Sequence, residues 1–261
     1  MTRSLSTQNP IGRLVSRREM LGILATAAAA ALLGCRRRRS GPQKPLRSLT
    51  SLSTAAAAVT PGCVVRPEQT EGPYFVDEKL NRSDIRSDPS DGSVKQGVPL
   101  RLAFQVSRTD GGSCIPLSGA IVDIWQCDAL GIYSDVRDIN GGFNTTGKKF
   151  LRGYQTTSAN GTAEFLTIYP GWYGGRAVHI HFKIRTDPAS RRAYEFSSQL
   201  YFDESITDQV HKQTPYNSKG RRSTTNDADF GFRQGGRQLM PTLTKDAQGY
   251  TTKFDIGLQM G

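Results

Sequence analysis

The sequence predicts an all-β fold, a β-sandwich with long loops, and three observations support that fold class. Apolar residues occupy every second position of residues 100–106 and of residues 178–184, which is the period of a strand with one face in a core. Turn-forming pairs such as Asn160-Gly161 separate the apolar runs. After residue 62, no long segment has the periodicity of an amphipathic helix.

Four further segments are strand candidates by their alternation and length, and they span residues 119–127, 162–168, 196–203 and 251–258. The region 204–250 is polar and rich in Gly and Arg. We therefore expect long loops there, with at most one short helix. Turns are also expected at Asp110-Gly111-Gly112 and Asn140-Gly141-Gly142.

The first 62 residues are predicted to lie outside the folded domain. Residues 1–35 resemble a twin-arginine signal peptide, because Arg17 and Arg18 precede an uncharged run that is shorter than the ~20 residues of a membrane span. An Ala-rich core helix would leave these arginines unexplained. Residues 36–62 lack periodicity and are predicted to be a disordered basic linker. The β-sandwich domain is expected to span residues 63–261.

The signal predicts export to the periplasm or the cell envelope. Leu32-Leu33-Gly34-Cys35 also resembles a bacterial lipoprotein cleavage box, although the Leu33 position more often carries a smaller residue. A lipid anchor at Cys35 is therefore an open alternative to a freely diffusing exported protein.

The net charge of +11 does not indicate a nucleic-acid partner. Residues 1–50 contain ten Lys or Arg and one acid, so +9 of the charge lies in the leader. Residues 51–261 then carry 24 bases and 22 acids, a net charge of +2. Because the basic residues belong to the leader and not to the domain, we expect no nucleic-acid binding.

Three cysteines remain when Cys35 is set aside: Cys63, Cys114 and Cys127. In an oxidising compartment we expect one disulfide and one buried thiol. Sequence alone leaves the pairing open. No Cys-x-x-Cys spacing occurs, which argues against a thiolate zinc site.

Two of the three histidines, His179 and His181, lie on one predicted strand. Because side chains alternate across a strand, both imidazoles project from the same face and can reach one metal ion. A solvated face or a satisfied polar pair would give the same spacing. The pair by itself therefore leaves metal binding undecided. The third histidine, His211, lies in a polar segment without a partner motif and is expected to be exposed to solvent.

Two tyrosines lie where they could join such a site. Tyr173 precedes the histidines across a Gly-rich turn, and Tyr133 lies in a turn that follows the strand candidate 119–127. Tyrosine is usually a packing residue. With a pKa of about 10, it binds a metal only when a strongly acidic cation displaces its proton. Ferric iron is such a cation, and phenolate with imidazole is a ligand set that suits it.

Taken together, four motifs resemble the intradiol ring-cleavage dioxygenases, the family that contains catechol 1,2- and protocatechuate 3,4-dioxygenases. The resemblance covers most of residues 65–203, and no single motif would carry it. The motifs are Gln69-Thr70-Glu71-Gly72-Pro73-Tyr74-Phe75, then Trp125-Gln126 through Gly131-Ile132-Tyr133, then Tyr173 with Arg176-x-x-His179-x-His181, and finally Gln199-Leu200-Tyr201-Phe202.

The resemblance implies one mononuclear, non-haem Fe³⁺ site and its ligands. Tyr133 and His179 would be equatorial ligands, and Tyr173 and His181 axial ligands. The implied reaction uses O₂ to open a catechol-type aromatic diol between its two hydroxylated carbons, which gives a muconate-type diacid. The implied partners are thus a small aromatic diol and O₂.

The resemblance also implies roles beyond metal binding. Arg176 would stabilise negative charge on the substrate ring, and Gln199 would support the site from a neighbouring strand. Gly72, Pro73 and Tyr74 would line the substrate mouth. The sequence departs from the larger enzymes in having only five residues between Tyr173 and His179, which leaves the pocket shape and the identity of the catechol open.

Two other functions compete with this hypothesis. An exported β-sandwich module that binds envelope carbohydrate or aromatic ligands would explain the signal and the aromatic residues, but not the spacing of the tyrosines, the arginine and the histidines. A zinc or ferrous hydrolase would use His179 and His181, yet those metals usually recruit a carboxylate or a third histidine. The oligomeric state is not predicted by the sequence.

Overall fold

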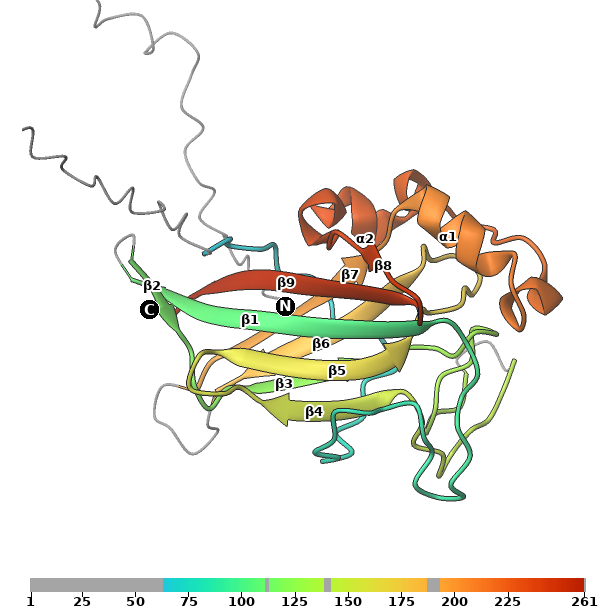
Figure 1. Cartoon of the computed structure of the whole chain (residues 1–261), viewed down its shortest axis with the longest axis horizontal. Coiled ribbons are helices and arrows are strands. Elements are labelled where there is room, and N and C mark those ends of the chain that lie inside the picture. Colours follow the sequence, from blue (N-terminus) through green and yellow to red (C-terminus); the bar gives the residue numbers. More distant parts are fainter. Residues whose placement is uncertain (1–62, 111–112, 139–141, 187–192, 261) are drawn as a thin grey trace, which may run out of the picture. The chain divides into compact units, whose positions relative to one another are not determined.

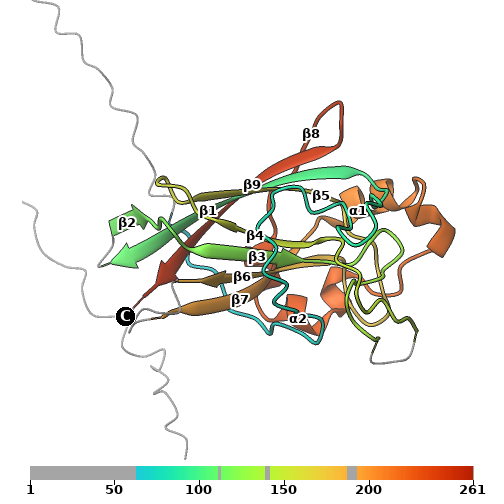
Figure 2. The same cartoon turned by 90° about the horizontal axis from the view of Figure 1, so that it is seen from below.

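The structure is a computed structural model that describes residues 63–110, 113–138, 142–186 and 193–260. The predicted signal peptide, the linker and Cys35 lie outside these residues, as do Gly111-Gly112 and Asn140-Gly141 of the expected turns. In the described residues, nine strands form two sheets that face one another (Figures 1 and 2). The predicted all-β sandwich is therefore confirmed.

The first sheet is built around one long strand, β1. This strand pairs in parallel with β9 along one edge, and in antiparallel fashion with β5 and then β2 along the other. The short strand β8 completes the sheet beyond β9. The bounds are β1 Pro99–Asp110, β2 Ser113–Pro116, β5 Thr162–Ile168, β8 Thr244–Lys245 and β9 Tyr250–Gln259.

The second sheet is antiparallel throughout, in the order β4-β3-β6-β7. Its strands are β3 Ile121–Trp125, β4 Arg152–Thr156, β6 His179–Arg185 and β7 Glu195–Tyr201. Every strand candidate of the sequence corresponds to an observed strand. Strands β2, β4 and β8 were not predicted.

The core fills the space between the two sheets, as the alternation of apolar residues predicts. Phe104 of β1 and Phe182 of β6 are both fully buried, and their ring centroids lie 5.2 Å apart. Phe254 of β9 contacts both rings. Apolar side chains from both sheets thus meet in one cluster, and their burial supplies the main stabilisation of a sandwich.

The region 204–250 contains more helix than the sequence predicted, so the expectation of at most one short helix is wrong. Its helical segments are α1 Glu204–His211, α2 Phe230–Arg233 and the 3₁₀ segments η1 Tyr216–Lys219, η2 Asn226–Ala228 and η3 Gly236–Leu239. Side-chain caps explain both α-helices: Asp203 accepts from two backbone N–H groups of α1, and Asp229 accepts from the Phe232 N–H of α2.

Helices α1 and α2 lie at one end of the sandwich, together with several long loops (Figure 2). Strand register puts three strand ends at this same end, because Trp125 pairs with His181 and His179 pairs with Tyr201. His179 and His181, the candidate metal ligands on β6, therefore lie where β3 ends, β6 begins and β7 ends. No helix in the described part of the chain is both long and apolar enough to cross a membrane.

A disulfide joins Cys63 to Cys114, and Cys127 is a buried free thiol. This outcome agrees with the expectation of one disulfide and one buried thiol, and it resolves the pairing that the sequence left open. The bond links the start of the described chain to β2 at the edge of the first sheet.

Candidate active site

The two histidines at the start of β6 project into the same buried space. The His181 ring stacks on Trp125 of the neighbouring strand β3, with centroids 5.0 Å apart and planes within 4° of parallel. His179 Nδ1 lies 2.7 Å from the backbone carbonyl oxygen of Ala177. Since only an N–H can donate to a carbonyl, Nδ1 carries the proton and Nε2 keeps its lone pair. Packing and hydrogen bonding thus orient both rings.

The two tyrosines complete a cluster around these nitrogens. The Nε2 atoms of His179 and His181 lie 3.0 Å apart, and the Tyr173 hydroxyl lies 3.2 Å from Nε2 of His179. The Tyr133 ring lies 5.7 Å from that of Tyr173 and 6.4 Å from that of His181, centroid to centroid. The structure therefore brings together all four residues that the sequence analysis named as ligands.

Two polar atoms of this cluster are buried without a hydrogen-bond partner in the described residues: the Tyr133 hydroxyl and Nδ1 of His181. Such atoms are uncommon in folded proteins, since leaving one unsatisfied costs about 1–3 kcal/mol. A bound ion that accepts electron density from the Tyr133 oxygen would remove one of these costs.

Burial keeps these four side chains neutral in the absence of a cation. It lowers the pKa of His179 to about 3, with a further contribution from the nearby Arg176 charge, and it lowers the pKa of His181 well below the ordinary value. Burial likewise raises the pKa of Tyr133 and of Tyr173. The imidazoles thus offer lone pairs at neutral pH, whereas the phenols need a strong Lewis acid to ionise.

This donor set fits a ferric ion. The two Nε2 atoms lie 3.0 Å apart, so both imidazole lone pairs could reach one ion. Across the described ranges, no cluster of three or more His, Cys, Asp or Glu side chains could hold a metal. The side chains that lie beside the two histidines are phenols, a donor type that favours Fe³⁺ over zinc or ferrous iron.

A cavity of about 620 Å³ opens directly beside this cluster. The residues expected at the substrate mouth, Gly72, Pro73 and Tyr74, all line it, together with Tyr133 and Tyr173. Gly72 has φ of +76°, and a Cβ at this position would lie 3.0 Å from the His181 ring. Only glycine combines this backbone conformation with such a close approach to a candidate ligand.

Arg176 also lines the cavity, and its guanidinium is held by polar groups on two sides. Its Nε donates to Asp229, at 2.8 Å, and its Nη2 donates to the side-chain oxygen of Gln199. Gln199 pairs with His181 in the sheet, so it connects Arg176 to the histidine strand. Both residues lie where the sequence analysis expected them, next to the histidines.

Three further polar residues at the site were not found from the sequence. Asp138 lines the cavity and accepts a hydrogen bond of 2.5 Å from Tyr74. Lys219 lines it from η1 and lies over the Trp172 ring, at 4.9 Å from the centroid. Asp229 contacts Arg176 from the helical region that was expected to be loops. None belongs to a motif, because each reaches the site through the tertiary fold.

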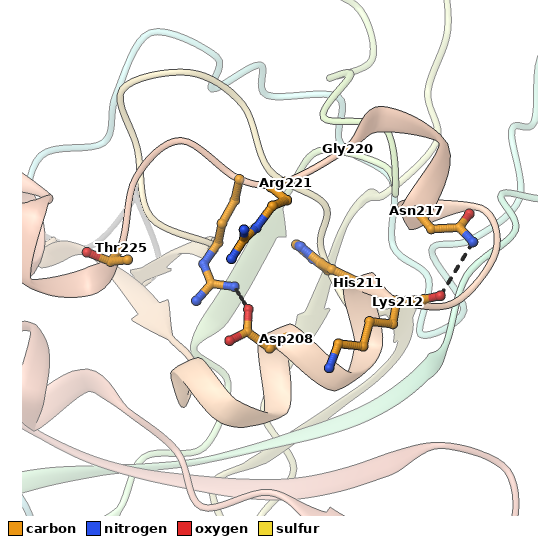
Figure 3. Close-up of a pocket in the computed structure, with 8 residues that line it drawn as sticks. Asp208, His211, Lys212, Asn217, Gly220, Arg221 and Thr225 are labelled. Atoms are coloured by element: carbon orange, nitrogen blue, oxygen red, sulfur yellow. Dashed lines mark hydrogen bonds and ion pairs between the residues drawn. The ribbon is translucent and has the colours of Figure 1, made fainter.

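A second cavity, of about 690 Å³, lies between α1 and the loop after η1 (Figure 3). Four of its eight lining residues are charged, and the lining consists of Asp208, His211, Lys212, Asn217, Gly220, Arg221, Arg222 and Thr225. None of the candidate iron ligands borders it. Arg222 forms ion pairs there with Glu204 and with Asp208.

His211 is not the exposed residue that the sequence predicted. Its Nε2 lies 3.1 Å from the Pro170 carbonyl oxygen, and its ring stacks on Tyr216 with planes 14° apart. Burial lowers the pKa of His211. The apolar partners come from η1 and from the loop after β5, which the polar local sequence does not indicate.

Comparison with known proteins agrees with this arrangement. A family model described as Dioxygenase matches residues 70–228, more than half of the chain. Catechol 1,2-dioxygenase 1 of Acinetobacter lwoffii is 28% identical over 157 residues, which are 50% of this chain and 45% of that one. The protocatechuate 3,4-dioxygenase beta chain of Burkholderia cepacia is 31% identical over 141 residues, which are 50% of this chain and 56% of that one. The chain thus spans about half the length of these curated relatives.

Among solved structures, an intradiol ring-cleavage dioxygenase from Tetranychus urticae matches with a TM-score of 0.63 and 31% identity, over 76% of this chain and 95% of that one. The fold and the site define a β-sandwich protein with a Tyr-His cluster beside a cavity that Arg176 also lines. With the family match added, the chain belongs to the intradiol ring-cleavage dioxygenase family.

Proposed function

We propose that this protein is a non-haem ferric-iron dioxygenase that opens catechol-type aromatic diols between the two hydroxylated carbons. O₂ is the co-substrate, and muconate-type diacids are the products. The observation that carries the proposal is the convergence of two imidazoles and two phenols beside a cavity lined by Arg176. Membership of the family supports the reaction type.

Tyr133, Tyr173, His179 and His181 would hold the iron. Once bound, the ferric ion would supply a Lewis acid that favours the deprotonated diol and activates its ring toward O₂. Tyr133 is fully buried, so it would hold the iron from within the protein. Tyr173 is only partly buried, so of the two tyrosines that line the cavity it would be the one that a diol can reach. Its phenolate oxygen would then accept a substrate proton.

Arg176 would act on the ring and not on the iron. Its guanidinium lies in a largely water-excluded position, where a cation stabilises developing negative charge far more than it does in water. Gln199 would keep this guanidinium aimed at the cavity from β7. Gly72, Pro73 and Tyr74 would admit the flat ring at the mouth.

Iron content and colour test the proposal directly. Phenolates bound to Fe³⁺ absorb visible light, so the purified protein should be red to burgundy without haem or flavin and should hold about one iron per chain. Tyr133→Phe should alter the colour both before and after anaerobic addition of catechol. Tyr173→Phe should alter mainly the colour of the free protein, and its catechol complex should form more slowly because the base that accepts the substrate proton is lost.

Tyr154→Phe on β4 is the matched control, because this residue is half-buried and does not line the cavity. Its spectrum should equal that of the wild type. A wild-type protein that stays colourless after ferric reconstitution, or Tyr133 and Tyr173 variants with unchanged spectra, would contradict the four-ligand assignment. The exported binding module would then become the better hypothesis.

The location of the protein is a separate proposal, supported by the sequence of the leader. We propose export by the twin-arginine route to the periplasm or cell envelope. The exported protein would either be released or carry a lipid anchor at Cys35. Replacing Arg17 and Arg18 together by Lys should trap the precursor in the cytoplasm. Normal envelope localisation of the Lys-Lys protein would refute the twin-arginine signal, and palmitate labelling of Cys35 would decide on the anchor.

A further inference from the structure

We propose that Asp229 and the short helix α2 position Arg176, and that this contact sets the rate of the chemical step. The inference rests on the proposed function. It means that the helical region after β7 contributes to catalysis by positioning Arg176. Asp229 lies 53 residues after Arg176 in the chain and outside every motif of the sequence.

The two carboxylate oxygens of Asp229 have different partners. Oδ2 accepts from Nε of Arg176, at 2.8 Å, and from the backbone N–H of Ala177, at 2.7 Å. Oδ1 accepts from the backbone N–H of Phe232, at 2.8 Å, and so caps α2. The side chain is fully buried. One carboxylate therefore fastens the arginine, the segment just before His179 and the helix to one another.

A fully buried carboxylate is costly unless it is paired and hydrogen-bonded, and here both conditions are met. Arg176 is the ion-pair partner of Asp229 in the described part of the chain. Capping the helix would require only Oδ1 of Asp229. Because Oδ2 accepts from Arg176 and Ala177, we infer that the second role of this carboxylate is to hold Arg176 in place.

The opposite side of the guanidinium is held as well. Its Nη2 donates to Gln199 and, at 3.4 Å, to the hydroxyl of Tyr201. Nε and Nη2 are thus occupied, and Nη1 is the guanidinium nitrogen without a hydrogen-bond partner among the residues that the structure describes. This nitrogen is the one left for a ligand in the cavity that Arg176 lines.

Packing at Gly231 gives independent support. A Cβ at this position in α2 would lie 2.6 Å from the Tyr201 hydroxyl, 3.0 Å from Nη2 of Arg176 and 3.1 Å from Oδ1 of Asp229. The backbone of α2 therefore packs so close to the guanidinium held by Asp229 that no room remains for a side chain at position 231. Any larger residue at 231 must displace at least one of these groups.

The first experiment compares Asp229→Asn with Asp227→Asn. Asn is the same size and keeps an oxygen for the cap, but it replaces the charge that faces Arg176. Asp227 lies two residues away on the surface, with its side chain 82% exposed. We expect Asp229→Asn to lower kcat per iron by about 10- to 100-fold, less than the full loss of an oxyanion-type donor. The colour, the iron content and the anaerobic catechol dissociation constant should stay close to those of wild type, and Asp227→Asn should match wild type throughout.

The second experiment keeps the proposal testable if Asp229→Asn folds poorly. Gly231→Ala leaves every charge in place and should also lower kcat per iron with the colour retained. Guanidinium ion provides a readout that a purely structural role would not change. At millimolar concentration it should restore part of the turnover of Arg176→Ala, because Asp229 and Gln199 still form its binding site. It should restore none in the Arg176→Ala, Asp229→Asn double variant.

The outcomes separate the inference from the function on which it rests. Equal kcat per iron in wild type, Asp229→Asn and Gly231→Ala would overturn the positioning role, as would equal rescue of the single and double variants. A wild-type protein that holds iron but opens no catechol would overturn the proposed function itself.

Discussion

Two cavities in the described part of this protein are similar in volume, about 620 and 690 Å³, but differ in how their polar groups are satisfied. The cavity beside the Tyr-His cluster is lined in part by the fully buried Tyr133, whose hydroxyl lacks a hydrogen-bond partner within the described residues. In the other, Arg222 is already paired with two partly exposed carboxylates. The larger cavity is therefore not the better candidate for chemistry.

The two cavities differ in the number of buried ionisable side chains near them whose pKa values are shifted. In the cluster beside the first cavity, burial shifts the pKa values of two histidines and two tyrosines in the directions that keep them neutral, so a cation would change all four environments. The second cavity also contains one unpartnered nitrogen, Nδ1 of His211. That ring is already held by Pro170 and Tyr216, and no tyrosine hydroxyl or second histidine lies beside it in the lining. Active sites tend to concentrate such perturbations.

The largest effect of a single arginine should come from the first cavity. Arg176→Ala should keep full iron content and lose about 2–4 kcal/mol of transition-state stabilisation, as for a lost oxyanion-type donor. The measurement is turnover per bound iron, with iron determined by metal analysis. Wild-type turnover in this variant would remove Arg176 from the mechanism and would weaken the contrast between the cavities.

Gly72→Ala should give an intermediate effect on the same cavity. At φ of +76° an added methyl group is strained, and it would also meet the His181 ring at 3.0 Å. We expect a loss of about 1 kcal/mol in unfolding free energy from the backbone alone. Contact with His181 should in addition weaken iron retention and shift the visible spectrum.

Gly92→Ala is the control for that prediction. Gly92 has nearly the same φ, +74°, and a Cβ there would meet nothing within 4 Å. Both variants should lose similar stability in thermal unfolding, but only Gly72→Ala should release iron faster to a chelator. Equal iron release from the two proteins would show that the approach of Gly72 to His181 is unimportant.

The strands that could be predicted from sequence are those with regular alternation. Strands β1 and β6 have it, because one face of each lies in the shared core. Strand β4 does not, since it begins with Arg152 and Gly153. Arg152 is only 2% exposed and is stabilised by the carbonyl oxygens of Ser134 and Tyr74, which no local pattern indicates.

The candidate site was predictable to a different extent. His179 and His181 could be grouped from strand periodicity, and Tyr133 and Tyr173 were candidates by their positions in nearby turns. The resemblance added Arg176, and the structure brings all five residues together. Asp229 could not be found in this way, because its distance in sequence from Arg176 is bridged only by the fold. His211 was misjudged for a related reason: its apolar neighbours come from other segments. Local sequence can identify site residues that a regular strand alternation places on one face. It cannot identify residues that reach the site only through contacts with segments distant in the sequence.

The smallest effect on turnover should follow from the same substitution in the second cavity. Arg222 bridges Glu204 and Asp208, whose side chains are 38% and 59% exposed. Solvent screens the two carboxylates, but the Arg222 side chain is itself only 11% exposed, so Arg222→Ala should cost about 1–2 kcal/mol of unfolding free energy. Iron content, colour and turnover per iron should stay at wild-type values, since no candidate ligand borders this cavity. Thermal unfolding and the iron assay used for Arg176→Ala measure both quantities. A loss of turnover comparable to that of Arg176→Ala would mean that the second cavity takes part in the reaction, and that unsatisfied buried groups are a poor guide to the active site of this fold.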